Sequence, residues 1–280
     1  MPVESPICYL NGSYLPLCDA SIPLEDLAIL RGYGVFEFLR TYSGIVFEPE
    51  SHFERLHHSA SKIGMSIPWT NAELLSIITE TVARNRFAEV GIRLIITGGR
   101  SADGKHADGQ PSLAVIVKAL LRPSAAEFAA GVKAITIRLT KDFPTAKSIS
   151  YAGALMALGR AEQAGAQEAL YLGENDVILE GTAVNFFAVC EGILRTAHDT
   201  IVAGITRQII LDLAQDLLPV GGPVKLHELP TVSEAFVTST SREVIPVTEI
   251  DSLQLSDGEP GPITRELRAR FQAHLSTSQL

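Results

Sequence analysis

The sequence predicts a two-domain α/β protein, and three observations carry that prediction. The chain has 280 residues, which is long for a single hydrophobic core. Alternating apolar runs, typical of strands, are interleaved with amphipathic helical patterns in both halves. The stretch ALLRPSAAE, residues 119–127, separates two such series and indicates a linker. We therefore expect a smaller α/β domain over residues 1–118 and a larger α/β domain over residues 128–280.

Turn residues and hydrophobic periods place the elements of the N-terminal half. Asn11-Gly12 and Ser43-Gly44 are typical of the tight turns of β-hairpins. In ESHFERLHHSASKIGM the apolar residues recur at helical spacing, and Thr70 is a suitable cap for the next helix. The predicted strands lie within 8–17, 34–47, 91–97 and 112–120, and the predicted helices at 50–65 and 71–87. This half should be largely antiparallel.

The C-terminal half shows the same alternation of element types. Its predicted strands lie at 132–139, 168–173, 185–195, 235–240 and 244–250, and its predicted helices at 152–165, from Gly204, and from about residue 262. A Pro-containing loop, KDFPTAKSISY, precedes the first of these helices. The half therefore has the composition of a second α/β domain.

Charge and cysteine usage exclude several classes of function. The formal net charge is -9, so the long-range field that attracts nucleic acid or an anionic membrane is absent. Cys8, Cys18 and Cys190 are an odd number without C-x-x-C spacing, which argues against a disulfide scaffold and against a zinc or other metal site. The N-terminus lacks the pattern of a signal peptide, and no run is long enough to span a membrane. We expect a cytoplasmic protein that binds anionic ligands through a few local arginines.

One stretch nearly matches a nucleotide-binding loop. In TGGRSADGKH, residues 97–106, Gly99, Gly104 and Lys105 have the required spacing, but His106 stands where the motif needs a hydroxyl residue. A phosphate-binding loop also needs a helix after it, whose N-terminal amides face the phosphate. Here Pro111 precedes a strand instead. We therefore interpret the stretch as a connection between strands.

A second group of residues fits carbonyl chemistry. Lys147 lies in the Pro-containing loop, and this loop leads directly into an apolar helical segment, so the ammonium could point into the interior. A desolvated lysine has a lowered pKa and can form a Schiff base with an aldehyde. A surface lysine is the alternative. Downstream, Glu180 is expected on a turn between two strands, the helix that begins at Gly204 can receive a phosphate with its free amides and Thr206, and a strand ends in the hydroxyl residues 238–241.

These segments, in this order, resemble the fold-type IV family of pyridoxal-phosphate enzymes. The family holds branched-chain aminotransferases, D-amino-acid transaminases, R-selective amine transaminases and aminodeoxychorismate lyase. The resemblance covers nearly the whole chain, through LEDLAILRGYGVFEFLRTY, HFERLHHSA, GIRLIITGG, AKSISY, LEGTAVNFF, GITRQII and FVTSTSREVIPV. It implies a two-domain fold like that of D-amino-acid aminotransferase, with the cofactor pyridoxal 5′-phosphate bound by the C-terminal domain.

The resemblance also implies a role for each matching position. Lys147 carries the cofactor as a Schiff base and moves the Cα proton of the substrate, and Glu180 keeps the pyridine nitrogen protonated. The phosphate is bound by Arg55, by the amides of Ile205 and Thr206, and by the hydroxyl of Thr240. Tyr151 lies near the ring oxygen, although branched-chain aminotransferases have a comparable tyrosine one residue later. As structural alternatives, Arg55 is a helix-surface arginine and Glu180 caps the turn at Gly181.

Two arginines are the candidate substrate ligands. Arg93, in GIRLIIT, should face away from Ile92 and Leu94, and it matches the arginine that binds the substrate α-carboxylate in branched-chain aminotransferases. Arg31 stands where many relatives have an aromatic residue. Each guanidinium can bind a carboxylate through two parallel hydrogen bonds. The alternative is that either arginine pairs with Glu25, Asp26 or Glu37. Further candidate ligands are Arg100 and Lys105 of the loop 97–106, which Gly98, Gly99 and Gly104 would make mobile, and Ser241.

The pair of arginines decides the expected substrate. The usual carboxylate trap of D-amino-acid transaminases, T-R-G-x-x-x-R-x-H, is replaced here by TGGRSADGKH. The combination of LRGYG, GIRL, TGG and TST is similar to a less usual D-amino-acid transaminase type with paired arginines. We expect transfer of an amino group between a D-amino acid and a 2-oxo acid such as 2-oxoglutarate or pyruvate. The alternatives are a branched-chain L-amino-acid aminotransferase, an aminodeoxychorismate lyase and a non-catalytic cofactor-binding protein. The resemblance also implies a homodimer.

Overall fold

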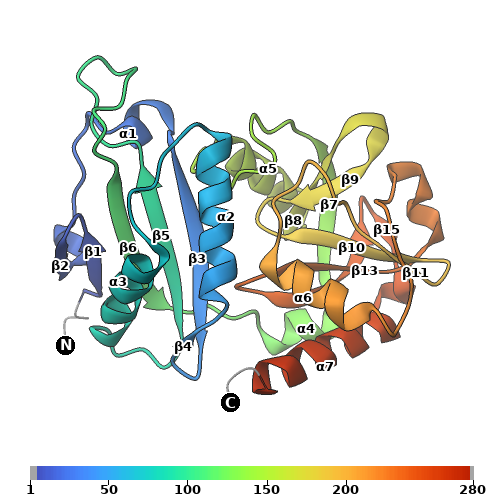
Figure 1. Ribbon diagram of the computed structural model, residues 1–280. Coiled ribbons are helices and arrows are strands. Elements are labelled where there is room, and N and C mark those ends of the chain that lie inside the picture. The colour runs from blue at the N-terminus through green and yellow to red at the C-terminus, as the bar shows by residue number, and fades with distance from the viewer. Residues whose placement is uncertain (1–4, 278–280) are drawn as a thin grey trace. The chain divides into compact units, whose positions relative to one another are not determined.

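The computed structural model describes residues 5–277, and the chain divides into two compact units (Figure 1). One unit is Met1–Leu121 with Ala146–Ser150, and the other is Arg122–Thr145 with Tyr151–Leu280. The short segment Ala146–Ser150 joins the first unit because it pairs with a strand there: Phe36 N donates to Lys147 O at 3.0 Å, and Ile149 N donates to Gly34 O at 3.1 Å. The sequence-based division had placed this segment in the C-terminal domain.

The first unit is built on an antiparallel sheet, as the sequence predicted. Its strand order is β2-β1-β6-β5-β3-β4. Figure 1 shows α2 and α3 against one face of this sheet. The elements are β1 (Ile7–Leu10), β2 (Ser13–Pro16), α1 (Leu27–Arg31), β3 (Gly34–Tyr42), β4 (Ile45–Val46), α2 (Pro49–Lys62), α3 (Asn71–Ala83), β5 (Val90–Thr97) and β6 (Ser112–Ala119). The loop 97–106 thus leads into strand β6, which confirms its interpretation as a strand connection.

Strand alternation gives the sheet of the first unit two different faces. Val35, Leu39 and Leu94 are buried beneath α2 and α3, where they form the core of the unit. The neighbouring residues Phe36 and Arg93 therefore lie on the opposite face, and Arg93 is exposed. The alternation in GIRLIIT predicted this orientation of Arg93, and the structure confirms it.

Helix α3 ends at Ala83, earlier than the predicted residue 87. Its start is as predicted, with a capping box between Thr70 and Glu73. Its end is set by Asn85, whose side chain donates to Ile7 O at 2.9 Å and to Thr81 O at 2.7 Å and accepts from Ile7 N at 2.9 Å. The two hydrogen bonds to Ile7 on β1 hold Asn85 where the next helical turn would begin. Such contacts with a distant strand cannot be predicted from the helical period of the sequence.

The second unit contains a sheet that closes on itself. Its strand order is β12-β11-β10-β13-β14-β7-β8-β9, and β9 also pairs with β10. The strands are β7 (Val132–Arg138), β8 (Glu168–Leu172), β9 (Ile178–Gly181), β10 (Asn185–Cys190), β11 (Ile193–Arg195), β12 (Val220–Gly221), β13 (Val232–Ser239), β14 (Glu243–Ile250) and β15 (Leu253–Gln254). Leu170, Phe186 and Val237 point inward and belong to the apolar core. Their neighbours along the strands consequently face outward.

The helices of the second unit are α4 (Ala125–Ala130), α5 (Ala152–Gln163), α6 (Ile205–Ala214) and α7 (Pro262–Thr277). The three helices predicted at 152–165, from Gly204 and from about residue 262 are confirmed. Helix α4 begins within residues 119–127, where the sequence indicated only a linker, and it starts with a capping box between Ser124 and Glu127. In the described part of the chain, no helix has the length and apolar character needed to cross a membrane.

Candidate functional site

Lys147 is held in place by its backbone, alongside the start of β3. Its amide donates to Ser59 Oγ on α2 at 3.0 Å, and its carbonyl accepts from Phe36 N. The close approach of the segment to β3 requires a glycine at position 34, because a Cβ there would lie 2.7 Å from Ile96 O and 2.8 Å from Ile149 Cδ1. The lysine side chain is partly buried. The position of Lys147 is therefore set by hydrogen bonds between its backbone and the distant elements α2 and β3.

The Lys147 ammonium and the Arg93 guanidinium share one aromatic neighbour. Lys147 Nζ lies 4.5 Å from the centre of the Phe36 ring, and Arg93 Cζ lies 5.9 Å from the same centre. Within the described residues Arg93 forms no ion pair, and the carboxylates that the sequence offered as partners are used elsewhere. Glu37 binds Arg55, and Asp26 accepts from Ala28 N and Thr97 Oγ1. The first unit thus presents an amine and a guanidinium beside one ring, and the guanidinium has no acidic partner among the described residues.

Arg55 is buried in a charge cluster and is not a helix-surface arginine. Its Nε and Nη2 donate to the two oxygens of Glu37 at 2.8 and 2.7 Å, and its side chain is 9% exposed. His52, one turn earlier on α2, contacts Glu37 Oε2 through Nδ1 at 2.8 Å. Glu37 lies on the buried face of β3. The cluster Glu37–His52–Arg55 fixes the direction of the guanidinium.

The charge states in this cluster follow from burial and pairing. Burial alone raises the pKa of the Glu37 carboxyl, but the Arg55 guanidinium and the hydrogen bond from His52 outweigh burial and lower the pKa to about 2. For His52, burial is the largest effect and lowers the pKa, in spite of the neighbouring carboxylate. Glu37 is therefore ionised and His52 neutral at pH 7. The Nε2 of His52 is buried without a hydrogen-bond partner among the described residues.

Arg31 and Arg100 lie around the loop 97–106. A Cβ at Gly104 would lie 3.6 Å from Arg31 Nη2, so the tip of the loop is close to the end of α1. Arg31 donates to Leu30 O, and within the described residues it forms no ion pair. Arg100 pairs with Glu25 at 2.8 Å, and both side chains are 62% exposed. Such an exposed pair contributes little stability and can be broken by a competing carboxylate.

In the second unit, Glu180 lies in β9, so its predicted position on a turn is wrong. The pairing of β8 with β9 is irregular between Leu170 and Leu172, and one extra residue is accommodated there. This irregularity turns Glu180 to the outer face, beside its cross-strand partner Asn185. The side chain of Glu180 is 6% exposed. A bulge interrupts the alternation of inward and outward residues along a strand. The sequence around Glu180 therefore lacks a strand pattern, and it was interpreted as a turn.

Several donors surround the Glu180 carboxylate. Oε2 accepts from Asn185 Nδ2 at 3.3 Å and from Val202 N at 3.1 Å. Oε1 accepts from the Lys141 ammonium at 2.7 Å. Glu180 is therefore bound from the side of α6 through Oε2 and from the β7–α5 loop through Oε1. It does not serve as a simple cap for Gly181.

The start of α6 offers free backbone donors next to Glu180. Gly204 is the N-cap residue and no side chain caps the helix, so the first amides, including those of Ile205 and Thr206, are available to a ligand. Gly204 is required because a Cβ would lie 1.8 Å from Asn185 Oδ1. On the strand beside Asn185, Thr238 Oγ1 is buried without a hydrogen-bond partner among the described residues. Thr240 and Ser241 follow at the end of β13, where both are partly buried.

Tyr151 is the N-cap residue of α5 and lies near the same polar face. The phenol of Tyr171, on β8, has its pKa raised first by burial and then by the neighbouring Glu168, Tyr151 and Glu180. These four side chains are thus close enough to interact electrostatically. In the second unit, Tyr151 and Glu180 thus lie near Tyr171, and Glu180, Thr238 and Gly204 lie next to Asn185.

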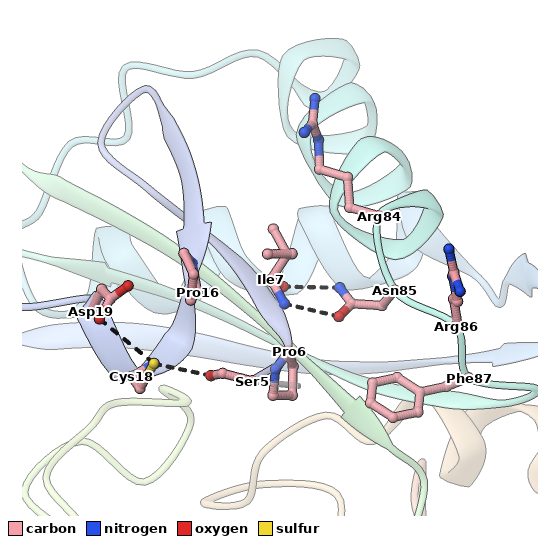
Figure 2. Close-up of a pocket in the computed structure, with 10 residues that line it drawn as sticks. All are labelled: Ser5, Pro6, Ile7, Pro16, Cys18, Asp19, Arg84, Asn85, Arg86 and Phe87. Atoms are coloured by element: carbon pink, nitrogen blue, oxygen red, sulfur yellow. Dashed lines mark hydrogen bonds between the residues drawn. The ribbon is translucent and has the colours of Figure 1, made fainter. Parts of the chain in front are cut away.

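A cavity of 690 Å³ in the first unit contains none of the predicted site residues. It lies between the N-terminal hairpin and the end of α3, with Cys18, Asn85 and Phe87 among its lining residues (Figure 2). Figure 2 shows Asn85 hydrogen-bonded to the backbone of Ile7, and Cys18 hydrogen-bonded to Ser5 and Asp19. These polar groups of the cavity already have structural partners.

Sequence reasoning gave no site role to four residues that shape these two clusters. They are Glu37, His52, Lys141 and Asn185. Glu37 lay in a strand pattern and appeared only as an alternative partner of a substrate arginine. His52 and Asn185 lie within HFERLHHSA and LEGTAVNFF but had no role of their own there. A signal was present for Asn185, since a polar residue at the start of the apolar run NFFAVC is unusual in a buried strand.

Known proteins match this chain over nearly its whole length. A family model described as Amino-transferase class IV matches residues 34–250. A protein of Methanocaldococcus jannaschii, provisionally named branched-chain-amino-acid aminotransferase, is 35% identical over 278 residues and the match covers 94% of each chain. The D-alanine aminotransferase of Staphylococcus epidermidis is 31% identical, with 97% of this chain and 99% of that one covered.

The solved structures agree with the fold. A branched-chain amino acid aminotransferase of T.th., solved with pyridoxamine 5′-phosphate, has a TM-score of 0.88 and 27% identity, and the match covers 98% of this chain and 95% of that one. The two-domain α/β fold of fold-type IV enzymes and the cofactor implied by the sequence motifs are thereby confirmed. The chain belongs to the class IV aminotransferases, which depend on pyridoxal 5′-phosphate and act on amino acids and 2-oxo acids.

Proposed function

We propose that this protein transfers the amino group between a D-amino acid and a 2-oxo acid such as pyruvate or 2-oxoglutarate. The observation that carries the proposal is the pairing of Lys147 and Arg93 around Phe36. An amine that moves a proton at the substrate Cα and a guanidinium that binds a carboxylate are what an amino acid requires. Primary amines without a carboxylate have no use for the guanidinium.

The polar groups of the second unit fit pyridoxal phosphate. Glu180 offers a buried carboxylate to a ring N–H, and the uncapped start of α6 offers amides to a phosphate. The buried hydroxyl of Thr238, which has no partner among the described residues, supports a polar ligand at this face. When bound, the cofactor supplies an electron sink for the carbon from which a proton is removed.

Each residue then has a defined task. Lys147 supplies the amine that holds the cofactor, and its Nζ takes up and returns the Cα proton. Glu180 keeps a proton on the ring nitrogen, and Tyr151 donates toward the ring oxygen. Arg55, held by Glu37, and Ile205, Thr206 and Thr240 bind the phosphate.

The arginines around the first unit determine which substrates bind. Arg93 takes the α-carboxylate, and Arg31 takes a second carboxylate or shares the first. Arg100 is held by Glu25 and is released to an incoming carboxylate. Ser241 is a further proposed substrate ligand, from the second unit. In this proposal the loop 97–106, with Gly104 beside Arg31, acts as a specificity lid. Replacing the loop changes substrate preference and leaves cofactor affinity unchanged.

The second candidate function is a branched-chain L-amino-acid aminotransferase. The M. jannaschii relative and the similar solved structure support this candidate by their names, whereas the S. epidermidis relative supports D-alanine. We favour the D-amino acid because the combination of LRGYG, GIRL, TGG and TST is similar to the D-amino-acid transaminase type with paired arginines. Arg31 and Arg93 form no ion pair within the described residues and can bind carboxylates, but the preference for the D configuration rests on the resemblance alone.

The protein is further proposed to act as a homodimer in the cytoplasm. Leu24 and Ile29 in the first unit are 79% and 49% exposed, and Leu155 in the second unit is 67% exposed. Large apolar side chains that are this exposed on each unit support contact with a partner chain. Cys8, Cys18 and Cys190 are free thiols, which supports a reducing compartment. Sedimentation of the purified protein tests the dimer.

A half-reaction panel tests the function. The purified holoenzyme is mixed with matched D- and L-amino acids, and the loss of the visible absorption of the bound cofactor is followed in time. D-alanine and D-glutamate should react faster than L-leucine and L-valine. The opposite order overturns the D-amino-acid proposal in favour of the branched-chain candidate. No spectral change with any amino acid indicates a binding protein, and pyruvate released from aminodeoxychorismate without an amino acceptor indicates a lyase.

A variant pair tests the carboxylate role of Arg93. Arg93→Ala should slow amino acids about 100-fold, since a charged hydrogen-bonded contact contributes about 1.5 to 3 kcal/mol. Amines without a carboxylate should be little affected. Arg86→Ala removes an exposed arginine of the same unit and serves as the control. Equal losses for amino acids and amines show that Arg93 is structural.

A further inference from the structure

Ser59 on α2 hydrogen-bonds to the backbone of Lys147. Its Oγ accepts from Lys147 N at 3.0 Å and donates to Arg55 O at 2.8 Å. The serine is fully buried. A serine hydroxyl has one hydrogen to donate, so the bond to Arg55 O leaves the lone pairs of Oγ for the Lys147 amide. The hydroxyl is therefore held in the orientation that accepts from the lysine.

The bond to Ser59 differs in kind from the bond that ties Lys147 to β3. Towards β3, Lys147 O accepts from Phe36 N at 3.0 Å, and both atoms belong to the main chain. The bond to α2 requires a side chain at position 59 that accepts a hydrogen bond. A substitution of Ser59 can therefore release the Lys147 amide, whereas a substitution of Phe36 leaves its main-chain donor in place.

Ser59 shares one face of α2 with the buried charge cluster. His52, Arg55 and Ser59 follow one another at spacings of three and four residues, which places them on one side of the helix. Burial is the largest cause of the lowered pKa of His52, and the Arg55 and Lys147 cations act in the same direction. The Lys147 ammonium is thus close enough to this face to interact with it. One helix thereby holds both the proposed phosphate ligand Arg55 and the backbone of Lys147.

We propose that Ser59 is a positioning residue for Lys147, whose amide it fixes on α2 so that the amine reaches the aldehyde carbon of a cofactor bound through its phosphate. The inference rests on the proposed roles of Lys147 and Arg55. The amine condenses with the aldehyde and releases water, and this step requires the nitrogen to lie within bonding reach of one carbon. A shift of the lysine backbone moves the base of the side chain and makes this geometry rarer.

Loss of the Ser59 hydroxyl should affect one form of the cofactor and not the other. Pyridoxal 5′-phosphate has the aldehyde with which Lys147 condenses, whereas pyridoxamine 5′-phosphate has none. Arg55 keeps its hydrogen bonds to Glu37 when Ser59 is changed. Ser59→Ala should therefore bind pyridoxal 5′-phosphate about tenfold more weakly, and its affinity for pyridoxamine 5′-phosphate should change by less than about twofold. The ratio of the two affinities, here called the aldehyde preference, is the measured quantity.

Thr81→Val is the matched control, and both variants are made in the full chain. Thr81 is a fully buried residue of α3 in the same unit, and its hydroxyl donates to Ile77 O, four residues earlier, at 2.6 Å. Among the described residues no hydrogen bond joins this hydroxyl to the segment 146–150. Each variant loses one buried hydroxyl, so both should lower the thermal midpoint by about 2 to 4 °C. Only Ser59→Ala should lower the aldehyde preference, and an equal change in Thr81→Val overturns the proposal.

Ser59→Cys separates the hydrogen bond from the filling of space. A thiol occupies the site but accepts hydrogen bonds only weakly, so this variant should also lower the aldehyde preference, by at least about threefold. A wild-type preference in Ser59→Cys overturns the proposal, because the volume at position 59 and not its acceptor is then what matters. Equal losses of affinity for the two forms of the cofactor in Ser59→Ala also overturn it, because they show a general disturbance.

Lys147→Ala separates this inference from the function on which it rests. If Lys147→Ala leaves the aldehyde preference unchanged, the proposed role of Lys147 fails, and the inference about Ser59 fails with it. If Lys147→Ala abolishes the preference and Ser59→Ala keeps the wild-type value, Ser59 is purely structural and only the inference fails. If both substitutions lower the preference, both proposals stand.

Discussion

Replacing Glu37 by Gln should destabilise the first unit far more than a change of one surface charge. The substitution keeps the volume of the side chain but removes the charge that faces Arg55 and His52. Glu37 is fully buried and the Arg55 side chain is only 9% exposed, so solvent cannot replace the lost countercharge. A nearly buried guanidinium would then remain without a carboxylate.

The magnitude follows from the lowered pKa of Glu37. The pKa falls from an ordinary value of 4.5 to about 2 in the folded protein. At about 1.4 kcal/mol per pH unit, the ionised carboxylate contributes about 3 kcal/mol at pH 7. Because the folded pKa is the lower one, this stability is complete above pH 4.5 and is lost as the pH falls toward 2. The difference between wild type and Glu37→Gln should therefore shrink in acid.

Urea unfolding followed by tryptophan fluorescence measures this effect. Trp69 is the single tryptophan of the chain and packs against the core of the first unit, so its emission reports the unit that contains Glu37. Glu80→Gln is the control, since Glu80 pairs with Arg84 at 2.7 Å but is 47% exposed and should contribute below about 0.5 kcal/mol. Equal losses of unfolding free energy for the two variants at pH 7, or a difference that does not depend on pH, refute the reasoning.

Two further predictions concern the second unit. Gly204→Ala places a methyl group 1.8 Å from Asn185 Oδ1 and should cost about 2 to 3 kcal/mol in urea unfolding and weaken cofactor binding. Gly222→Ala, where a Cβ meets nothing within 4 Å, should change neither, and similar effects of both variants contradict the close-contact argument. Thr238→Val replaces a buried hydroxyl that has no partner among the described residues and should leave the cofactor-free protein equally stable or about 1 kcal/mol more stable. Thr196→Val removes a hydroxyl that donates to Phe186 O at 2.8 Å and should destabilise, so a loss of stability in Thr238→Val as large as in Thr196→Val disproves the distinction.

The positions of site residues were predicted correctly where local periodicity sets them and wrongly where contacts with distant segments set them. Arg93 was placed correctly because strand alternation is a local property of the chain, and the start of α6 at Gly204 was predictable from its helical period. Glu180 was misplaced on a turn because the irregular pairing of β8 with β9 turns it outward. That irregularity depends on the partner strand, which the sequence does not identify.

Burial and pairing of charges were the least predictable features. Arg55 was offered as a phosphate ligand or a surface residue, but the structure gives it two hydrogen bonds to Glu37 from a strand 18 residues away. Lys141 had no motif, and its contact with Glu180 spans 39 residues. Electrostatic partners at such separations are selected by the fold, since no period in the sequence relates them.

The sequence by itself determined the order and type of most of the longer elements, the family of enzymes and its cofactor, and the exposed face of Arg93, but not α1, α4, β9 or β12. These depend on local periods, capping residues and motifs of fixed spacing. Only the tertiary structure decided that Ala146–Ser150 lies along β3, that Glu37 and His52 hold Arg55, and that Lys141 binds Glu180. The physical reason is that these contacts arise when distant segments are packed together, and the desolvation that makes them strong exists only in the folded chain.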